Sequence, residues 1–150
     1  MEGVTRQEFD KAVRTIGEYL TKFSGNKTSF TEDNSVPANF FASASVKYVN
    51  ITTQVVVAAF DKKSIDVIFN SGVVKIPNQN LVAFFRQLLA WNYVASGMAH
   101  YALNESTNIT SLILRRPFEG FDYSEFKEAL ENISTTNLNG LILLRQKFPV

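Results

Sequence analysis

The spacing of the apolar residues changes along the chain, and this change constrains the fold more than any other feature. In residues 5–23 the apolar side chains recur at alternating steps of four and three residues, which is a helical period. Thr5 and Glu8 match a capping box, and Gly25 suits a left-handed helix end. We therefore expect a helix with one face in the core and the other in solvent. The apolar stripe consists of Phe9, Val13, Ile16, Leu20 and Phe23.

From about residue 28 to residue 76 the period falls to two, which is typical of strands with one buried face. Residues 40–48 alternate between larger or apolar and smaller or polar side chains. The segment from Thr53 to Phe60 is apolar and β-branched on both faces, as expected for a central strand. This region therefore predicts a β-sheet next to the first helix.

Turn signals divide the strand region further. We expect a turn at residues 61–64 and a second turn at residues 70–72, which would split residues 65–76 into two short strands. Such short connections predict antiparallel neighbours. Residues 26–37 are polar and contain a proline, so they form either a loop or a weak edge strand.

A second helix is expected after Pro77 interrupts the strand pattern. Asn78 or Asn80 can cap its start, and it should end around Ser96–Gly97. Its apolar side chains cover more than half of the helix circumference, which predicts a helix that is buried on two sides. These side chains are Leu81, Phe84, Phe85, Leu88, Leu89 and Trp91.

Two more strands, at residues 98–103 and 109–116, are expected on either side of the polar turn at 104–108. Asp122 and Glu125 match a second capping box, which begins a third helix. The predicted order is therefore helix, three or four strands, helix, two strands and helix, written α-β-β-β-α-β-β-α with three strands, in one domain over residues 1–150. Runs of strands between helices indicate an α+β fold, with an antiparallel sheet of about five strands and three helices.

Composition excludes several classes of function. The 150 residues include 15 Lys+Arg, 14 Asp+Glu, one His and no Cys. A disulfide, a thiolate metal site and a multi-histidine centre are therefore not expected, and a net charge of +1 offers little attraction to nucleic acid. The first ten residues lack the apolar core of a secretion signal, and no stretch has the ~18 apolar residues of a membrane span. We expect a cytoplasmic protein without cofactor, metal, nucleic-acid or membrane partner.

Candidate catalytic groups are few. His100 could act as a general base with a carboxylate, but a lone histidine on the outward face of a strand is usually structural. Four acids near the third helix more simply complement the helix dipole than form an acid–base pair. These acids are Glu119, Asp122, Glu125 and Glu128. Arg115 and Arg116 beside two phenylalanines would make only a weak nucleic-acid patch. We therefore predict no catalytic residues.

The C-terminal half contains LLAWNYVASGMAHYAL (88–103) and LILRRPFEGFDYSEFKEAL (112–130). A helix ending at Leu88–Asn92, a strand after Gly97, a corner at Arg115–Gly120 and a capped helix follow one another. Over residues 81–145 this pattern resembles the type III secretion chaperone-like fold, and within it the YbjN-like group of bacterial proteins. The resemblance implies small α+β homodimers, some of which hold an extended client segment on apolar grooves. Secretion chaperones are usually acidic, whereas this chain is neutral, which favours an outlying branch.

The functional prediction is a non-enzymatic protein-binding module, acting as a chaperone, assembly factor or regulator. We expect the aromatic surplus of the second helix to be covered by a second copy of the chain or by a client. The predicted interface residues are Phe84, Phe85, Leu88, Trp91 and Tyr93. Two alternatives stay open for function, a small hydrolase-type enzyme using His100 and a structural subunit of a larger complex. In a monomer, the first and third helices would have to cover the second.

Overall fold

A computed structural model describes residues 3–94 and 99–148. In chain order, the elements are α1 (Arg6–Ser24), β1 (Thr31–Glu32), β2 (Phe40–Tyr48), β3 (Ile51–Ala59), the short 3-10 turn η1 (Phe60–Lys62), β4 (Asp66–Lys75), α2 (Leu81–Val94), β5 (His100–Asn104), β6 (Ile109–Pro117) and α3 (Tyr123–Lys147). The six strands form one antiparallel sheet in the order β1-β2-β3-β4-β6-β5. The predicted α+β class and element order are confirmed. The additional strand is β1, which realises the weak edge strand expected between residues 26 and 37.

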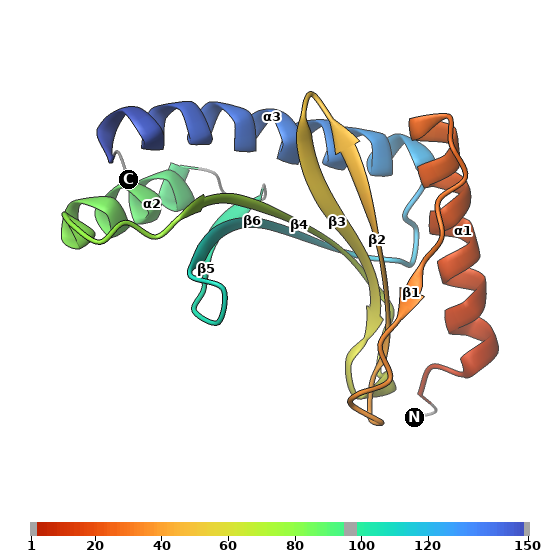
Figure 1. Ribbon diagram of the computed structural model, residues 1–150. Coiled ribbons are helices and arrows are strands. Elements are labelled where there is room, and N and C mark those ends of the chain that lie inside the picture. The colour runs from red at the N-terminus through yellow and green to blue at the C-terminus, as the bar shows by residue number, and fades with distance from the viewer. Residues whose placement is uncertain (1–2, 95–98, 149–150) are drawn as a thin grey trace.

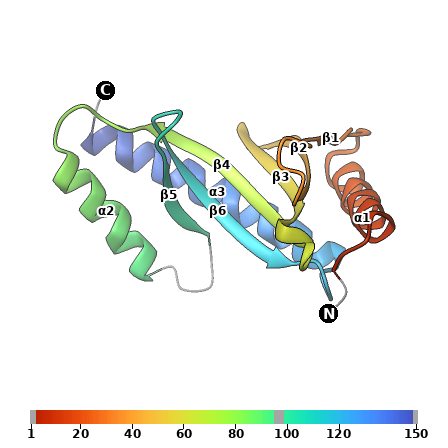
Figure 2. The ribbon, with the colours of Figure 1, turned by 90° about the horizontal axis from the view of Figure 1, so that it is seen from below.

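The sheet is curved, and the helices lie on one face or at its ends. Figure 1 shows α3 along one face, α1 at the β1/β2 end and α2 at the β5 end, and Figure 2 shows the same arrangement from below. The core lies between this face, α1 and α3. Its largest fully buried side chains include Phe9, Ile16 and Leu20 from α1, Phe69 and Leu112 from the sheet, and Phe126, Leu130, Ile133 and Leu144 from α3.

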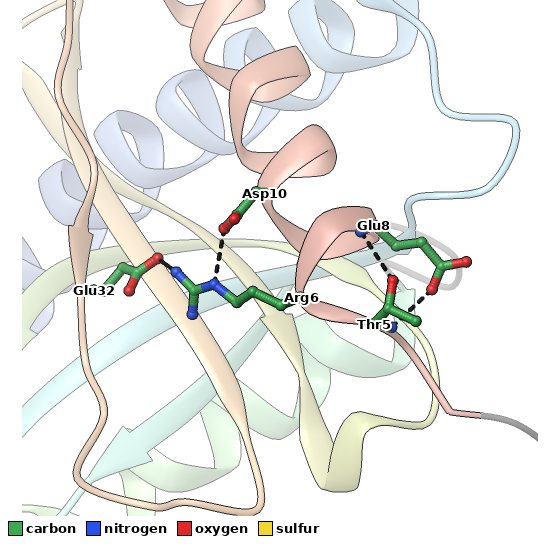
Figure 3. Close-up of polar contacts among 5 residues, drawn as sticks. All are labelled: Thr5, Arg6, Glu8, Asp10 and Glu32. Carbon is green, nitrogen blue, oxygen red and sulfur yellow. Dashed lines mark hydrogen bonds and ion pairs between the residues drawn. The ribbon is translucent and has the colours of Figure 1, made fainter.

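Both predicted capping boxes are present. The Thr5 hydroxyl accepts a hydrogen bond from the backbone N–H of Glu8, and the Glu8 carboxylate accepts one from the Thr5 N–H (Figure 3). Asp122 and Glu125 make the same reciprocal pair at the start of α3. Gly25 ends α1 in a left-handed conformation, with φ of 76°, which glycine adopts without steric cost. Local sequence signals therefore define where these helices begin and where α1 ends.

The predicted turn at Asn70–Gly72 is wrong. Residues 66–75 form one continuous strand, β4, whose pairing with β6 shifts register between Gly72 and Val74. The Asn137 side chain of α3 donates hydrogen bonds to the Ser71 hydroxyl (2.6 Å) and to the Gly72 carbonyl (3.0 Å). The turn-favouring residues Asn70–Gly72 thus lie at a β-bulge instead of a turn. The buried side-chain amide of Asn137 stabilises the irregular backbone there.

Helix α2 is not buried on two sides in the single chain. Phe84 and Leu88 lie in the core, whereas Val82 and Leu89 are 69% and 67% exposed. The covering expected for a monomer is also absent, because α1 lies at the opposite end of the sheet (Figure 1) and the outward side of α2 stays exposed. The predicted helix end at Ser96–Gly97 and the start of the next strand at Met98 lie outside the described residues.

None of the helices among the described residues combines the length and the apolar character that crossing a bilayer requires.

Candidate functional site

The large apolar side chains with the highest exposed fractions lie on α2. We define the α2 patch as Leu81, Val82, Leu89 and Tyr93, which are 41%, 69%, 67% and 89% exposed. Val82, Leu89 and Tyr93 are separated by seven and four residues, so the helical period places them in one stripe. The exposed Arg86 lies between Val82 and Leu89 on this side of the helix, so the stripe is apolar at its two ends and charged in between. Exposed apolar side chains on one side of a helix are a feature of surfaces that bind another protein.

The structure separates the five predicted interface residues. Phe84 is 0% exposed and Leu88 is 5% exposed, so both belong to the core of this chain. Phe85 and Trp91 are half-buried, and Tyr93 is exposed within the α2 patch. Leu81, Val82 and Leu89 were missed as interface residues, although a helical wheel places Val82 on the same side as Tyr93. Apolar spacing alone does not distinguish the core side of such a helix from its free side.

Helix α2 also closes the β5 edge of the sheet. The Asn92 side chain donates a hydrogen bond from Nδ2 to the Tyr101 carbonyl (3.0 Å) and accepts one at Oδ1 from the Tyr101 N–H (2.7 Å). The Trp91 ring lies 5.3 Å from the Tyr101 ring, centroid to centroid. Burial raises the pKa of Tyr101 to about 12. The amide therefore takes the place of a neighbouring strand at Tyr101, whose outward N–H and C=O are not free to pair with another chain.

The opposite edge of the sheet is only partly closed. Strand β1 pairs with β2 at Thr31–Ser43 and Glu32–Ala42. Beyond these pairs, no strand within the described residues pairs with the outer edge of β2 from residue 44 to residue 48. A free strand edge of this kind presents unpaired N–H and C=O groups to a partner.

A groove of about 600 Å³ lies against this free edge, and we call it the β2 groove. It is formed by the end of α1, the loop that follows α1, the second half of β2 and the first half of α3. Its aromatic side chains are Phe23, Tyr48 and Tyr123, and its charged side chains are Lys47, Lys127 and Glu131. The Phe23 and Tyr48 rings are 5.5 Å apart, and Lys22 Nζ lies 4.2 Å from the Tyr123 ring centroid. The groove thus combines a main-chain edge with aromatic walls, an arrangement suited to an extended peptide.

His100 has no catalytic surroundings. It is exposed at the start of β5, and within residues 3–94 and 99–148 no hydrogen bond or ion pair joins its ring to a carboxylate. A polar cleft near α3, which includes Arg116, Glu125 and Glu128, has a volume of about 200 Å³ and does not include His100. This is below the ~300 Å³ at which small-molecule sites usually begin. Glu125 caps α3, so the acidic cluster has at least one structural role.

The two arginines of the predicted nucleic-acid patch are not brought together on one surface. Arg115 Nε donates to Asp66 Oδ2 at 3.0 Å, and its guanidinium lies 5.4 Å from the Phe60 ring centroid. Arg116 follows it in β6, so its side chain points to the other face of the sheet. Phe121 is 9% exposed and packs against Phe69 and Phe126. The geometry therefore gives no basic aromatic surface at this position.

The described residues contain no group of three or more His, Asp or Glu side chains that could hold a metal ion. The candidate functional surfaces are accordingly the α2 patch and the β2 groove with the free β2 edge.

No protein-family model and no curated protein matches this sequence. Two solved structures are similar to it in fold. The crystal structure of the ExsC–ExsE complex contains a chain with a TM-score of 0.63 and 18% identity, covering 87% of this chain and 94% of that one. The structure of the HopA1–SchA chaperone–effector complex contains a chain with a TM-score of 0.66 and 10% identity, covering 91% and 98%.

At these identities the likeness shows the fold alone. The chain has a type III secretion chaperone-like fold, as the resemblance in the C-terminal half predicted. The likeness covers most of the chain, so it also includes the N-terminal half, where the sequence resembled the family only in the order of its elements.

Proposed function

We propose that this protein is a non-enzymatic, protein-binding chaperone, assembly factor or regulator that acts as a homodimer. The observation that carries the proposal is the α2 patch, in which Val82, Leu89 and Tyr93 are each more than 60% exposed. Exposed apolar side chains of this kind are unfavourable in water and are stabilised when another protein covers them. The similar folds, both solved as complexes with another protein, support the same function.

The α2 patch is proposed as the dimer interface. Two copies of a helix with a single apolar stripe can pack against each other about a twofold axis, because such an interface is self-complementary. The predicted interface is thereby revised. Phe85, Trp91 and Tyr93 remain available at the surface, whereas Phe84 and Leu88 support the helix from the core.

The β2 edge and the β2 groove are proposed as the client site. An extended client segment would add its main chain beside residues 44–48 and place alternate side chains against Phe23, Tyr48 and Tyr123. Main-chain pairing gives affinity with little sequence dependence, and the aromatic walls add selectivity. Both surfaces are free at the same time, because α2 and the β2 edge lie at opposite ends of the molecule (Figure 2).

The proposal includes a cytoplasmic location, a bacterial origin and an affiliation with the YbjN-like group, supported by the resemblance of residues 81–145. It does not include the hydrolase alternative, because His100 is exposed and unpaired among the described residues. A structural subunit of a larger complex would use the same α2 patch and would differ only in the lifetime of the complex.

The oligomeric state of a double variant tests the proposal. We expect the wild-type chain to scatter light as a particle of twice 16.8 kDa and the Val82→Asp/Leu89→Asp variant to scatter as a monomer. Charges in the patch would be desolvated in the dimer but stay in water in the monomer, so the fold is retained. Circular dichroism checks that the variant remains folded.

Val36→Asp is the matched control, since Val36 is 51% exposed in the loop between β1 and β2. These two strands lie at the other end of the molecule from α2 (Figure 1). It should keep the wild-type particle mass. A wild-type chain that is monomeric at micromolar concentration, or a control that dissociates as readily as the patch variant, would contradict dimerisation through α2.

A further inference from the structure

A segment of the chain itself already occupies part of the β2 edge. We call residues 27–35 the edge strap. After Gly25 ends α1, the chain reverses and runs back between α1 and β2, where Figures 1 and 2 show β1 lying between these two elements. The strap contributes β1, and the Asp33 N–H donates a hydrogen bond to the Phe41 carbonyl at 2.9 Å. The strap thus covers residues 41–43 of the edge proposed to bind a client.

The strap is held mostly by exposed contacts. Apart from Thr28 and Phe30, all its residues are exposed. The half-buried Phe30 ring lies over Gly17 of α1, where a Cβ would be 3.8 Å from the ring. The Glu32 carboxylate forms an ion pair with the Arg6 guanidinium, which also binds Asp10 at 3.1 Å (Figure 3). One aromatic contact and one exposed ion pair form a weak attachment, because exposed ion pairs contribute little to stability.

The strap competes with a client for the same backbone groups. Because the N–H and C=O groups of a strand alternate between its two edges, those of Phe41, Ser43, Ser45 and Lys47 point outward together. The strap uses the first half of this row and leaves the second half unpaired within the described residues. A client strand that paired with the free half, residues 44–48, would meet the strap at Ser43. It could pair with the rest of the edge only by displacing the strap.

The strap also shows which side chains this edge accepts. Phe30 and Glu32 are two residues apart, so they point to the same face of an extended chain, toward Gly17 and Arg6 of α1. Arg6 would lose one of its two carboxylate partners when the strap leaves. A client with an apolar residue followed two positions later by an acidic residue would restore both contacts.

We propose that the edge strap is an autoinhibitory strand that mimics the client, and that the client is an extended segment with an apolar-x-acidic pattern that displaces it. This inference rests on the proposed function, because it assumes that the β2 edge binds a client. It adds a mechanism of control, since the exposed edge is shortened while no client is bound and lengthens when one binds. The strap also shields part of the edge from unwanted pairing.

Hydrogen exchange of the wild-type chain tests whether the strap opens on its own. The Asp33 amide should exchange about 100-fold faster than the Val57 amide of β3, because local opening requires less free energy than global unfolding. Equal protection of the two amides would mean that the strap leaves only when the protein unfolds, and would overturn the proposal.

A peptide exchange experiment tests the competition directly. The probe is a fluorescein-labelled peptide that copies residues 26–36, and the receptor is the full chain with Phe30→Ser and Glu32→Gln, which weaken its own strap. We expect this variant to bind the peptide about tenfold more tightly than wild type, because a tethered intact strap competes at high effective concentration. A peptide carrying the same two substitutions is the matched control and should bind poorly.

A disulfide lock identifies the site. Since the chain has no Cys, Thr31→Cys/Ser43→Cys in the weakened-strap background allows only one intramolecular disulfide. Oxidation should abolish peptide binding and reduction should restore it. Binding that is insensitive to oxidation, or no binding to a folded weakened-strap variant, overturns the strap proposal. Neither result changes the particle mass of the wild-type chain, so a failure of the proposed dimer is recognised separately by light scattering.

Discussion

The two edges of the sheet are closed in different ways. At the β5 edge, the Asn92 amide bonds to both backbone groups of Tyr101, and the Trp91 and Tyr101 rings pack together. At the β2 edge, a two-residue strand and an exposed ion pair between Glu32 and Arg6 cover only part of the strand. Both arrangements satisfy backbone groups, but only the first combines hydrogen bonds with a contact between two half-buried aromatic rings.

This difference shows which edge can serve binding. Opening the β5 edge separates an aromatic pair and leaves half-buried polar groups without partners, so it is costly. Opening the β2 edge moves residues that are mostly in solvent already. A partner strand therefore has less to displace at β2, while α2 secures β5 and turns its own outer face to solvent.

The largest expected effect is at the closed edge. Asn92→Ala removes both hydrogen bonds to Tyr101 and leaves its backbone N–H and C=O without their partner. We expect a loss of about 2 kcal/mol in the free energy of unfolding, measured by urea denaturation. Asn39→Ala is the matched control, since the Asn39 side chain makes one exposed hydrogen bond, to the Asp61 N–H. If Asn39→Ala lowers the free energy of unfolding as much as Asn92→Ala does, the stronger closure of the β5 edge is contradicted.

The pH dependence of stability should show the burial of the β5 edge. Burial raises the pKa of Tyr101 from 10.0 to about 12, so the unfolded chain ionises at lower pH than the folded one. The contribution of neutral Tyr101 is therefore fully present below pH 10 and is lost as the pH rises toward 12. Urea midpoints over this range should fall less steeply in Tyr101→Phe than in wild type. The exposed Tyr93→Phe control should retain the wild-type slope.

A smaller effect is expected at the open edge. Desolvation by burial lowers the pKa of Arg6, but the carboxylates of Glu32 and Asp10 together raise this pKa above its ordinary value. Glu32→Gln should reduce the unfolding free energy by only about 0.5 kcal/mol, since the pair is exposed. It should nevertheless speed exchange of the Asp33 amide about twofold, whereas Asp10→Asn, which leaves the Glu32–Arg6 pair intact, should not. Equal effects of the two variants would mean that the ion pair does not hold the strap.

The smallest effect concerns the turn that ends the strap. Hydrogen bonds from Ser35, including its backbone N–H at 2.9 Å, hold the pKa of Asp33 below its ordinary value of 3.8. The ionised carboxylate thus favours this turn above pH 3.8, and the contribution is lost as the pH falls further. The Ser35 amide shift in NMR should follow this titration and should lose it in Asp33→Asn. A titration midpoint at or above 3.8 would contradict the hydrogen bond.

Much of the fold follows from local signals in the sequence. The capping boxes at Thr5 and Asp122 and the alternation in residues 40–48 act within a few residues, so the corresponding elements are confirmed. The turn expected at Asn70–Gly72 is wrong, because its support comes from Asn137, more than 60 residues away. Turn-forming residues cannot distinguish a turn from a bulge when a distant side chain decides between them.

The candidate site was predictable only in outline. The apolar surplus of residues 81–94 indicated an interaction helix, but Phe84 and Leu88 are in the core and Val82 and Leu89 are outside. Residues 26–37 were expected to form either a loop or a weak edge strand, and the structure contains the two-residue strand β1. The choice between them depends on Glu32 reaching Arg6 and on β1 pairing with β2, contacts that join separate parts of the chain.

The sequence by itself determined the kind and order of the helices and strands, because apolar period and capping are properties of neighbouring residues. Only the tertiary structure decided which side of α2 is buried, that β6 rather than β5 lies next to β4, and that residues 27–35 cover part of the β2 edge. These features arise from contacts between residues distant in sequence, and their free energy depends on the whole packed arrangement. The surfaces proposed for binding belong to this second group, since they are defined by what the rest of the chain leaves uncovered.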